Sequence, residues 1–229
     1  SLTLPYVVNM GTNVFEDSAI QSVKFEKGWI EIPEYTFYNC DDLRDVEFPE
    51  GLSLIGSYAF AKCVSLNKIF LPDSMLEIGQ FAFSGCKTLT EVDLNDGLKR
   101  IDNNAFENCS FLKSIKLPSS LWTVAYRAFM NCTSLEKITW PINVEFVSQE
   151  CFSGCKSLTE VALHDSINTI YDHAFNDCTS LSQIYLPNSI ITIEEYAFSN
   201  CASLTAIDMP DYLTEFSEGL FSGCTSLKE

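Results

Sequence analysis

The chain has 229 residues, of which 46% are hydrophobic, and its 31 acidic residues outnumber its 14 basic ones, for a formal net charge of −17. This charge argues against nucleic acid and anionic membrane surfaces as partners, because both attract basic patches. No run of about 18 apolar residues occurs, so the sequence predicts no transmembrane helix and no membrane insertion. The first ten residues also lack the basic and apolar regions of a signal peptide.

A fixed repeat of 23 residues runs through most of the chain. Nine cysteines recur at this interval, each with a phenylalanine three positions before it and a leucine three positions after it. They are Cys40, Cys63, Cys86, Cys109, Cys132, Cys155, Cys178, Cys201 and Cys224. A period of this length is typical of a solenoid, in which each coil packs only on its neighbours.

The first coil is divergent. Counting back 23 residues from Cys40 reaches Asp17, and counting back from Phe37 reaches Val14, so neither signature residue is kept. A divergent first coil is typical of a capping repeat. Residues 1–13 follow no clear register, and we expect them to cover the open end of the stack.

The repeat predicts one domain. We expect a single solenoid over residues 1–229, with residues 1–32 as the divergent N-terminal capping coil and residues 33–229 as regular coils. The repeat breaks off at the C-terminal end without a comparable cap, which favours a piece of a longer protein.

The sequence of each regular coil predicts a short strand, a turn, an extended piece and a helical turn, in that order. The Ile-x-Leu-Pro segments, as at 115–118 and 184–187, alternate with a period of two and end at a proline, which has no N–H for a strand ladder. The next stretch, as at 75–79, favours a second short strand or an extended edge. The Ala-Phe-x-x-Cys stretch, as at 82–86, has apolar residues at i, i+1 and i+4, which favours one turn of α or 3₁₀ helix.

This repeat resembles the BspA-like leucine-rich repeat family. The resemblance rests on stretches such as 66–72 and 78–86 and covers about residues 18–229. It implies an α/β repeat fold, a right-handed leucine-rich-repeat solenoid with a parallel sheet on one face. It also implies a surface or secreted protein of anaerobic bacteria or parasitic protists that adheres to host matrix proteins or other cells. The expected location is therefore extracellular or at the cell surface.

Four residues depart from the repeat. His164 and Asn95 occupy proline positions, Trp140 occupies a strand leucine position, and Cys151 occupies an alanine position. These departures bring the local loop geometry into question and leave the fold prediction unchanged.

The cysteines predict a ladder of free thiols. Nine of the ten occupy the same inward position, and their parallel Cα–Cβ bonds disfavour the geometry of a disulfide. A buried thiol instead behaves as a small hydrophobic group. Cys151 and Cys155 form the one additional pair, but a zinc site would need two more ligands nearby. We interpret both as core residues.

The sequence lacks the common motifs of enzyme active sites and nucleotide-binding sites. It contains no nucleophile elbow, phosphate-binding loop, dinucleotide fingerprint or zinc-protease motif. The sequence therefore predicts a protein that is not an enzyme, with no catalytic residues, no metal site and no cofactor.

A candidate binding strip follows the strands. The seventh residue after each cysteine points outward from the predicted strand, and function in a solenoid resides at such variable positions of the sheet face. The candidate strip consists of Glu47, Phe70, Asp93, Lys116, Tyr185 and Asp208. Phe70 and Tyr185 are candidate hot spots for a partner, since aromatic residues dominate many interfaces. The alternative is a hydrated surface with two aromatics left by drift.

A second stripe of aromatic residues lies five positions before the cysteines, at Tyr35, Tyr58, Phe81 and Tyr196. One interpretation is side-chain stacking that shields the helical turns. The other is a platform that binds a sugar or a peptide.

The leading functional hypothesis is a non-enzymatic protein-binding or adhesion module of a surface or secreted protein. It would bind its protein partner on the strand face, a host extracellular-matrix protein being one candidate. The alternatives are a structural spacer that displays other domains and a carbohydrate-binding module.

Overall fold

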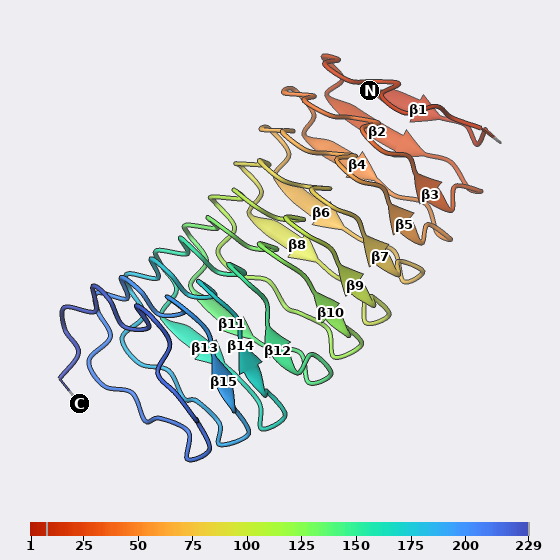
Figure 1. Cartoon of the computed structure of the whole chain (residues 1–229). Helices are drawn as coiled ribbons and strands as arrows, with labels where there is room; N and C mark the ends of the chain where they lie inside the picture. The colour runs from red at the N-terminus through yellow and green to blue at the C-terminus, as the bar shows by residue number, and fades with distance from the viewer. Residues whose placement is uncertain (8, 229) are drawn as a thin grey trace.

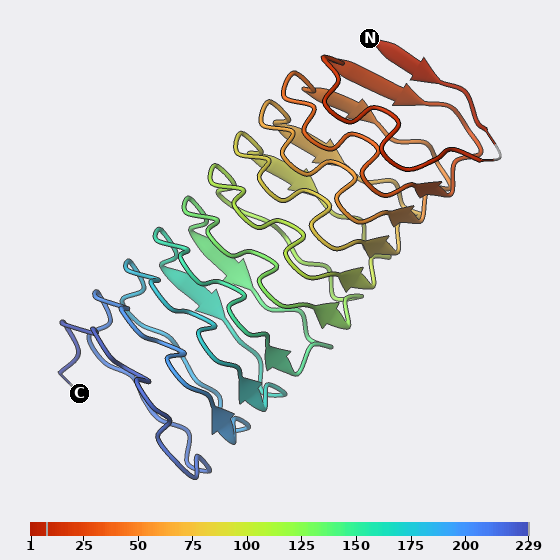
Figure 2. The same cartoon turned by 45° about the horizontal axis from the view of Figure 1, so that its top comes forward.

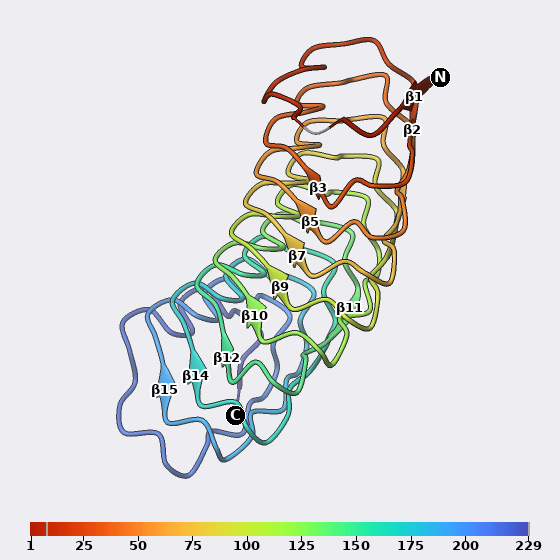
Figure 3. The ribbon, with the colours of Figure 1, turned by 90° about the vertical axis from the view of Figure 1, so that its right-hand side faces the viewer.

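A computed structural model of the chain describes residues 1–7 and 9–228, so that Val8 and Glu229, which the predicted domain includes, lie outside the described residues. The chain winds into a stack of similar coils, with the N-terminus at one end and the C-terminus at the other (Figure 1). Seen from the side, the axis of the stack curves (Figure 3). The described residues form fifteen short strands, and every strand pairing is parallel.

The strands form two rows along the stack (Figure 1). We name the first row, which follows the cysteines, the first strand face; it comprises β1 (Leu2–Leu4), β2 (Ser22–Phe25), β4 (Asp45–Glu47), β6 (Lys68–Phe70), β8 (Glu91–Asp93), β11 (Lys137–Thr139) and β13 (Glu160–Ala162). Its sheets are β1-β2-β4, β6-β8 and β11-β13. Their regular pairs match residues 23 apart, as in Lys68↔Glu91, so equivalent side chains of successive coils lie side by side.

The second row consists of two-residue strands in the extended piece of each coil. It comprises β3 (Glu31–Ile32), β5 (Leu54–Ile55), β7 (Glu77–Ile78), β9 (Arg100–Ile101), β10 (Thr123–Val124), β12 (Phe146–Val147), β14 (Thr169–Ile170) and β15 (Thr192–Ile193). They form the sheets β10-β9-β7-β5-β3 and β12-β14-β15. Of the two interpretations of this stretch, the structure thus shows the second short strand.

The predicted helical turn is wrong: the described residues contain no helix. In the coil that ends at Cys86, Phe81 and Gly85 have φ of +55° and +75°, which no right-handed helix accommodates. The backbone N–H groups alternate in their partners. Those of Phe81, Phe83 and Gly85 donate to carbonyls of the next coil at 2.7–2.9 Å, whereas those between them close turns within the coil. Two consecutive tight turns, joined to the next coil by a third ladder, therefore replace the helix.

The sequence carried a signal for these turns. The residue before each repeat cysteine is Asn, Asp or Gly in every coil except one, where it is Lys62. These three residue types adopt the left-handed conformation at the lowest cost, and Asn39, Asn131 and Asn200 do so here. The spacing of apolar residues favoured a helix because the turns also point their side chains inward at i, i+1 and i+4.

The phenylalanines form a continuous buried ladder. From Phe37 to Phe221, the centroids of successive rings lie 5.3–5.9 Å apart and the ring planes differ by at most 17°. Every ring from Phe37 to Phe198 is fully buried. Because one coil cannot bury its own ring on both faces, each coil depends on its two neighbours.

The cysteines form a second ladder beside the phenylalanines. From Cys63 to Cys224, each Sγ donates to the carbonyl of the phenylalanine 26 residues earlier, at 3.1–3.3 Å. Burial raises the pKa of the Cys86 and Cys132 thiols from 9.0 to about 12. All ten cysteines are free in the structure. The position thus requires a small apolar side chain that also donates a hydrogen bond.

The first coil is shifted by one residue relative to the expected counting. The ring that stacks on Phe37 belongs to Phe15, with centroids 5.2 Å apart, whereas Val14 is 47% exposed. The N–H of Phe15 accordingly donates to the carbonyl of Thr36. Donor and acceptor are one residue closer in the sequence than in the equivalent bond of a regular coil, from Phe83 to Ala105. Near the N-terminus, β1 also has a register that the sequence did not reveal, since it pairs with β2. The division into a cap and regular coils remains a prediction.

The departures from the repeat are accommodated locally. The Trp140 Nε1–H donates to the carbonyls of Val144 and Phe146, both at 3.1 Å. Asn95 replaces the proline and donates to two carbonyls of the preceding coil, and His164 lies 3.1 Å from the carbonyl of Pro141. Cys151 is fully buried, as expected for a core residue.

We predict that Phe129→Ala lowers the free energy of unfolding by about 3–5 kcal/mol, because the ring is fully buried between Phe106 and Phe152. Val14→Ala is the control and should change it by less than about 0.5 kcal/mol, since Val14 is exposed. Chemical denaturation of both variants measures the difference. Equal losses would contradict the ladder as the main stabilising element.

We also predict alkaline destabilisation. A thiol with its pKa raised by burial stays protonated in the folded chain after it ionises in the unfolded chain, so unfolding releases protons above about pH 9. The stability that protonated Cys86 and Cys132 contribute is complete below pH 9 and is lost as the pH rises toward 12. In this range, each thiol should make the free energy of unfolding fall by an additional amount of about 1.4 kcal/mol per pH unit.

Denaturation at several pH values between 8 and about 10.5 measures this decline. Cys132→Ala removes one titrating thiol, so its free energy of unfolding should fall less steeply with pH than that of the parent chain. Parallel curves for the two proteins would contradict the prediction.

Candidate functional site

The first strand face carries the six residues of the candidate binding strip, and all six are exposed. Strands β4, β6 and β8 supply Glu47, Phe70 and Asp93. Lys116, Tyr185 and Asp208 occupy the same position in coils where the structure assigns no strand on this face. The alternation is clear in β6, where Ile69 is buried and Phe70 is 53% exposed. The outward direction of these side chains therefore follows from the period-two pattern of each strand.

The structure does not gather the six residues into one pocket. Phe70 and Tyr185 are five repeats apart, which corresponds to roughly 24 Å at the usual strand spacing. In Figure 2, the blue coils that follow β13 lie several coils along the stack from the yellow region of β6. Any contact with both aromatics therefore requires an extended partner surface.

Ion pairs link neighbouring strands of the same face. Lys68 pairs with Glu91 at 2.8 Å and Lys137 with Glu160 at 2.6 Å, and Lys24 pairs with Glu47. These side chains are about half exposed or more, so water screens each pair, which contributes little to stability and exchanges readily. Within residues 1–7 and 9–228, Asp93, Lys116 and Asp208 form no ion pair, so their charges remain available to a partner.

A shallow hollow of about 410 Å³ lies at the C-terminal end of this face. It is lined by residues 159–161, 183–185 and 205–208 of three successive coils. Tyr185 and Asp208 of the strip belong to it, whereas the other four strip residues do not. Thr159, Thr205 and Ala206 also line the hollow, and their side chains are small. The spacing of the repeat predicts outward positions on this face but no concave site.

The second aromatic stripe is a column of stacked rings. The Tyr35 and Tyr58 centroids lie 4.7 Å apart and the Tyr58 and Phe81 centroids 4.6 Å apart, with planes within 12° of parallel. Tyr196 stacks on His173 at 5.1 Å. A sugar binds to the exposed face of a ring, but stacking along the column covers these faces. The structure therefore supports the stacking interpretation, with tight turns in place of the helical turns.

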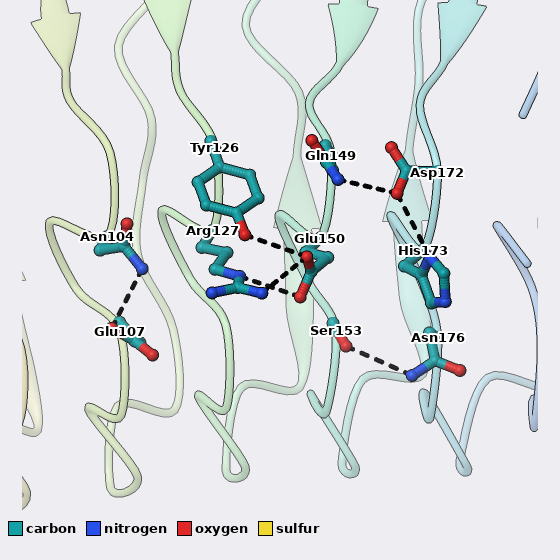
Figure 4. Close-up of polar contacts among 10 residues, drawn as sticks. All are labelled: Asn104, Glu107, Tyr126, Arg127, Gln149, Glu150, Ser153, Asp172, His173 and Asn176. Atoms are coloured by element: carbon teal, nitrogen blue, oxygen red, sulfur yellow. Dashed lines mark hydrogen bonds and ion pairs between the residues drawn. The ribbon is translucent and has the colours of Figure 1, made fainter. Parts of the chain in front are cut away.

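Between Phe81 and Tyr196, the position five residues before the cysteine is occupied by polar or charged side chains. These side chains contact polar groups of their own and neighbouring coils (Figure 4). Arg127 donates to Glu150 through Nε at 2.9 Å and through Nη2 at 2.8 Å, and Tyr126 Oη donates to Glu150 at 3.1 Å. Burial and the hydrogen bond to Glu150 raise the pKa of Tyr126. Arg127 and Glu150 both have positive φ. The ion pair thus joins two strained turns of adjacent coils.

The next coils continue this network. Gln149 donates to Asp172 at 2.8 Å, and the His173 Nδ1 lies 3.3 Å from the same carboxylate (Figure 4). The contact of Gln149 with Asp172 joins neighbouring coils, as that of Arg127 with Glu150 does, so we interpret the network as structural. Among the described residues, no group of three His, Cys, Asp or Glu side chains is placed to hold a metal ion.

Comparison with known proteins agrees with this architecture. A family model described as the BspA type leucine rich repeat region, in six copies, matches residues 8–135 and 122–229. The fold is that of a leucine-rich-repeat solenoid, and the chain belongs to the BspA-type leucine-rich repeat family. No curated protein sequence matches the chain.

Among solved structures, the chain is similar to a T. pallidum leucine-rich repeat protein, with 27% identity, a TM-score of 0.66, and coverage of 88% of this chain and 91% of that one. The pneumococcal vaccine antigen PcpA is 18% identical, with a TM-score of 0.50 over 99% of this chain and 76% of that one, and this likeness concerns the fold alone. A leucine rich cell surface protein of Faecalibacterium prausnitzii is 22% identical, with a TM-score of 0.49 and coverage of 99% and 86%.

No helix in the described part of the chain is long and apolar enough to cross a membrane.

We predict that Phe70→Ala and Tyr185→Ala each change the free energy of unfolding by less than about 0.5 kcal/mol, because both side chains are mostly exposed. Chemical denaturation of the two variants checks this. A loss above about 1 kcal/mol would instead show that these aromatics stabilise the fold.

Proposed function

We propose that the chain is a non-enzymatic protein-binding module of a surface or secreted protein, and that its partner binds on the first strand face. A host extracellular-matrix protein is one candidate partner. The observation that carries the proposal is the exposure of Phe70 and Tyr185 on an otherwise polar sheet face. Large aromatic side chains that contribute nothing to the core are the usual anchors of protein interfaces.

The rigidity of the face supports this proposal. Glu47, Phe70 and Asp93 lie on the short strands β4, β6 and β8, and the Phe and Cys ladders fix the coils that carry all six strip residues, so little backbone conformational entropy would be lost on binding. Membership of the BspA-type leucine-rich repeat family supports the expectation, drawn from the resemblance above, of an adhesive protein at an extracellular or cell-surface location.

Two features favour a binding role over catalysis. Burial raises the pKa of Cys63, Cys86 and Cys109, so these thiols are protonated and shielded at neutral pH. The polar side chains on the turns, such as Glu150 and Arg127, bind one another. We therefore propose no catalytic residue and no cofactor for this protein. We also propose that residues 1–229 form a single domain.

A structural spacer is the second candidate. The regular ladders would make such a stack a rod that displays other domains, and a spacer needs no ligand. Carbohydrate binding on the aromatic column has less support, since the rings of Tyr35, Tyr58 and Phe81 cover one another.

A binding screen against extracellular-matrix proteins and glycans tests the proposal. We expect a matrix protein to bind the parent chain and to bind the double variant Phe70→Ala, Tyr185→Ala at least about tenfold more weakly, since hot-spot residues contribute about 2 kcal/mol or more.

The matched control is Phe111→Ala, Tyr212→Ala, which removes an equally exposed phenylalanine and tyrosine outside the strip. Equal weakening in both double variants would argue against the first strand face as the site. No binding to any matrix protein at high micromolar concentration would favour the spacer.

A further inference from the structure

The hollow on the first strand face differs from the rest of that face in the exposure of one ring. Tyr185 is 64% exposed, and its neighbours at the same position of the adjacent coils are the small Ala162 and the short Asp208. No aromatic ring among the described residues stacks on it, in contrast to Tyr58, which is covered on both faces. Tyr185 therefore offers an open ring face at the wall of a concave site.

The charged groups that line the hollow are both carboxylates. They belong to Glu160 and Asp208, which lie on the two outer coils of the three that form it. Asp208 forms no ion pair within the described residues. Glu160 pairs with Lys137, but this ion pair is exposed and exchanges readily. At the outer rim, the backbone N–H of Lys228 donates to the carbonyl of Thr205. The net charge of −17 adds an attractive field for a cation.

The backbone of the hollow has free polar groups as well. In the part of the chain that the structure describes, segments 183–185 and 206–208 form no backbone hydrogen bond with each other. The ladder resumes only at the rim, where the N–H of Thr205 bonds to Ser182 at 3.1 Å. A ligand that donates several hydrogen bonds would find carbonyl as well as carboxylate acceptors here.

We infer that this hollow receives an arginine or lysine side chain of the protein partner, against the ring of Tyr185 and between Glu160 and Asp208. This inference rests on the proposed function, for which it names the chemistry that the partner presents. A guanidinium stacks on a tyrosine ring and donates to carboxylates in its own plane, so arginine satisfies the site more fully than lysine does. A volume of about 410 Å³ accommodates such a side chain with the adjoining peptide.

The test uses a twelve-residue peptide with four arginines and the same peptide with citrulline in place of arginine, titrated into the whole chain at physiological salt. Citrulline keeps the shape of arginine and removes its charge. We expect the arginine peptide to bind, the citrulline peptide to bind at least about tenfold more weakly, and Asp208→Asn and Tyr185→Ala each to weaken arginine binding about five- to tenfold.

The matched control is Asp93→Asn, which removes an exposed, unpaired carboxylate from the same strip outside the hollow. It should change the affinity less than twofold. Equal weakening by Asp93→Asn and Asp208→Asn would overturn the inference, since it would show attraction by the whole acidic surface. Equal binding of the two peptides would also overturn it.

A failure of the arginine site can be distinguished from a failure of the proposed function. A matrix protein that loses affinity with Phe70→Ala but keeps it with Asp208→Asn would overturn the arginine site and leave binding on the first strand face intact. Loss with Asp208→Asn, with no effect of Asp93→Asn, would support both. Melting temperatures of all variants show that each one is folded.

Discussion

Each coil of this protein completes its hydrogen bonds and buries its phenylalanine only against the coils beside it. The N–H groups of Phe81, Phe83 and Gly85 donate to the next coil, and the thiol of Cys109 donates back to the carbonyl of Phe83. A single coil of 23 residues could neither bury its ring nor pair these groups, and unpaired buried polar groups are costly. The stack of coils is therefore the unit that is stable, and every surface feature depends on it.

This dependence explains why so many residues that resemble functional ones are structural. A column of tyrosines, ten cysteines and a network of ion pairs would each attract attention in another protein. Here they occupy repeat positions and contact their counterparts one coil away, as Tyr35 contacts Tyr58 and Arg127 contacts Glu150. Side chains that lack such a counterpart are the informative ones, and Phe70, Tyr185 and Asp208 are among them.

The residues that define the repeat lie in the buried core, and the chain belongs to the BspA-type leucine-rich repeat family. Similarity to the T. pallidum leucine-rich repeat protein extends over most of both chains at 27% identity. The outward positions of the first strand face lie outside the buried ladders, so the packing of the core places little constraint on their side chains. A binding specificity particular to this chain would therefore reside there, in the strip and the hollow.

The sequence by itself determined the period, the inward ladders of Phe and Cys, the first strand and the outward direction of the strip. All of these follow from the spacing of apolar residues along the chain. Only the tertiary structure decided between a helical turn and two left-handed turns, because that choice depends on hydrogen bonds from one coil to the next. The same holds for the ladder position of Phe15 in place of Val14. It holds also for the hollow, which is lined by residues of three neighbouring coils, a neighbourhood that a single repeat does not show.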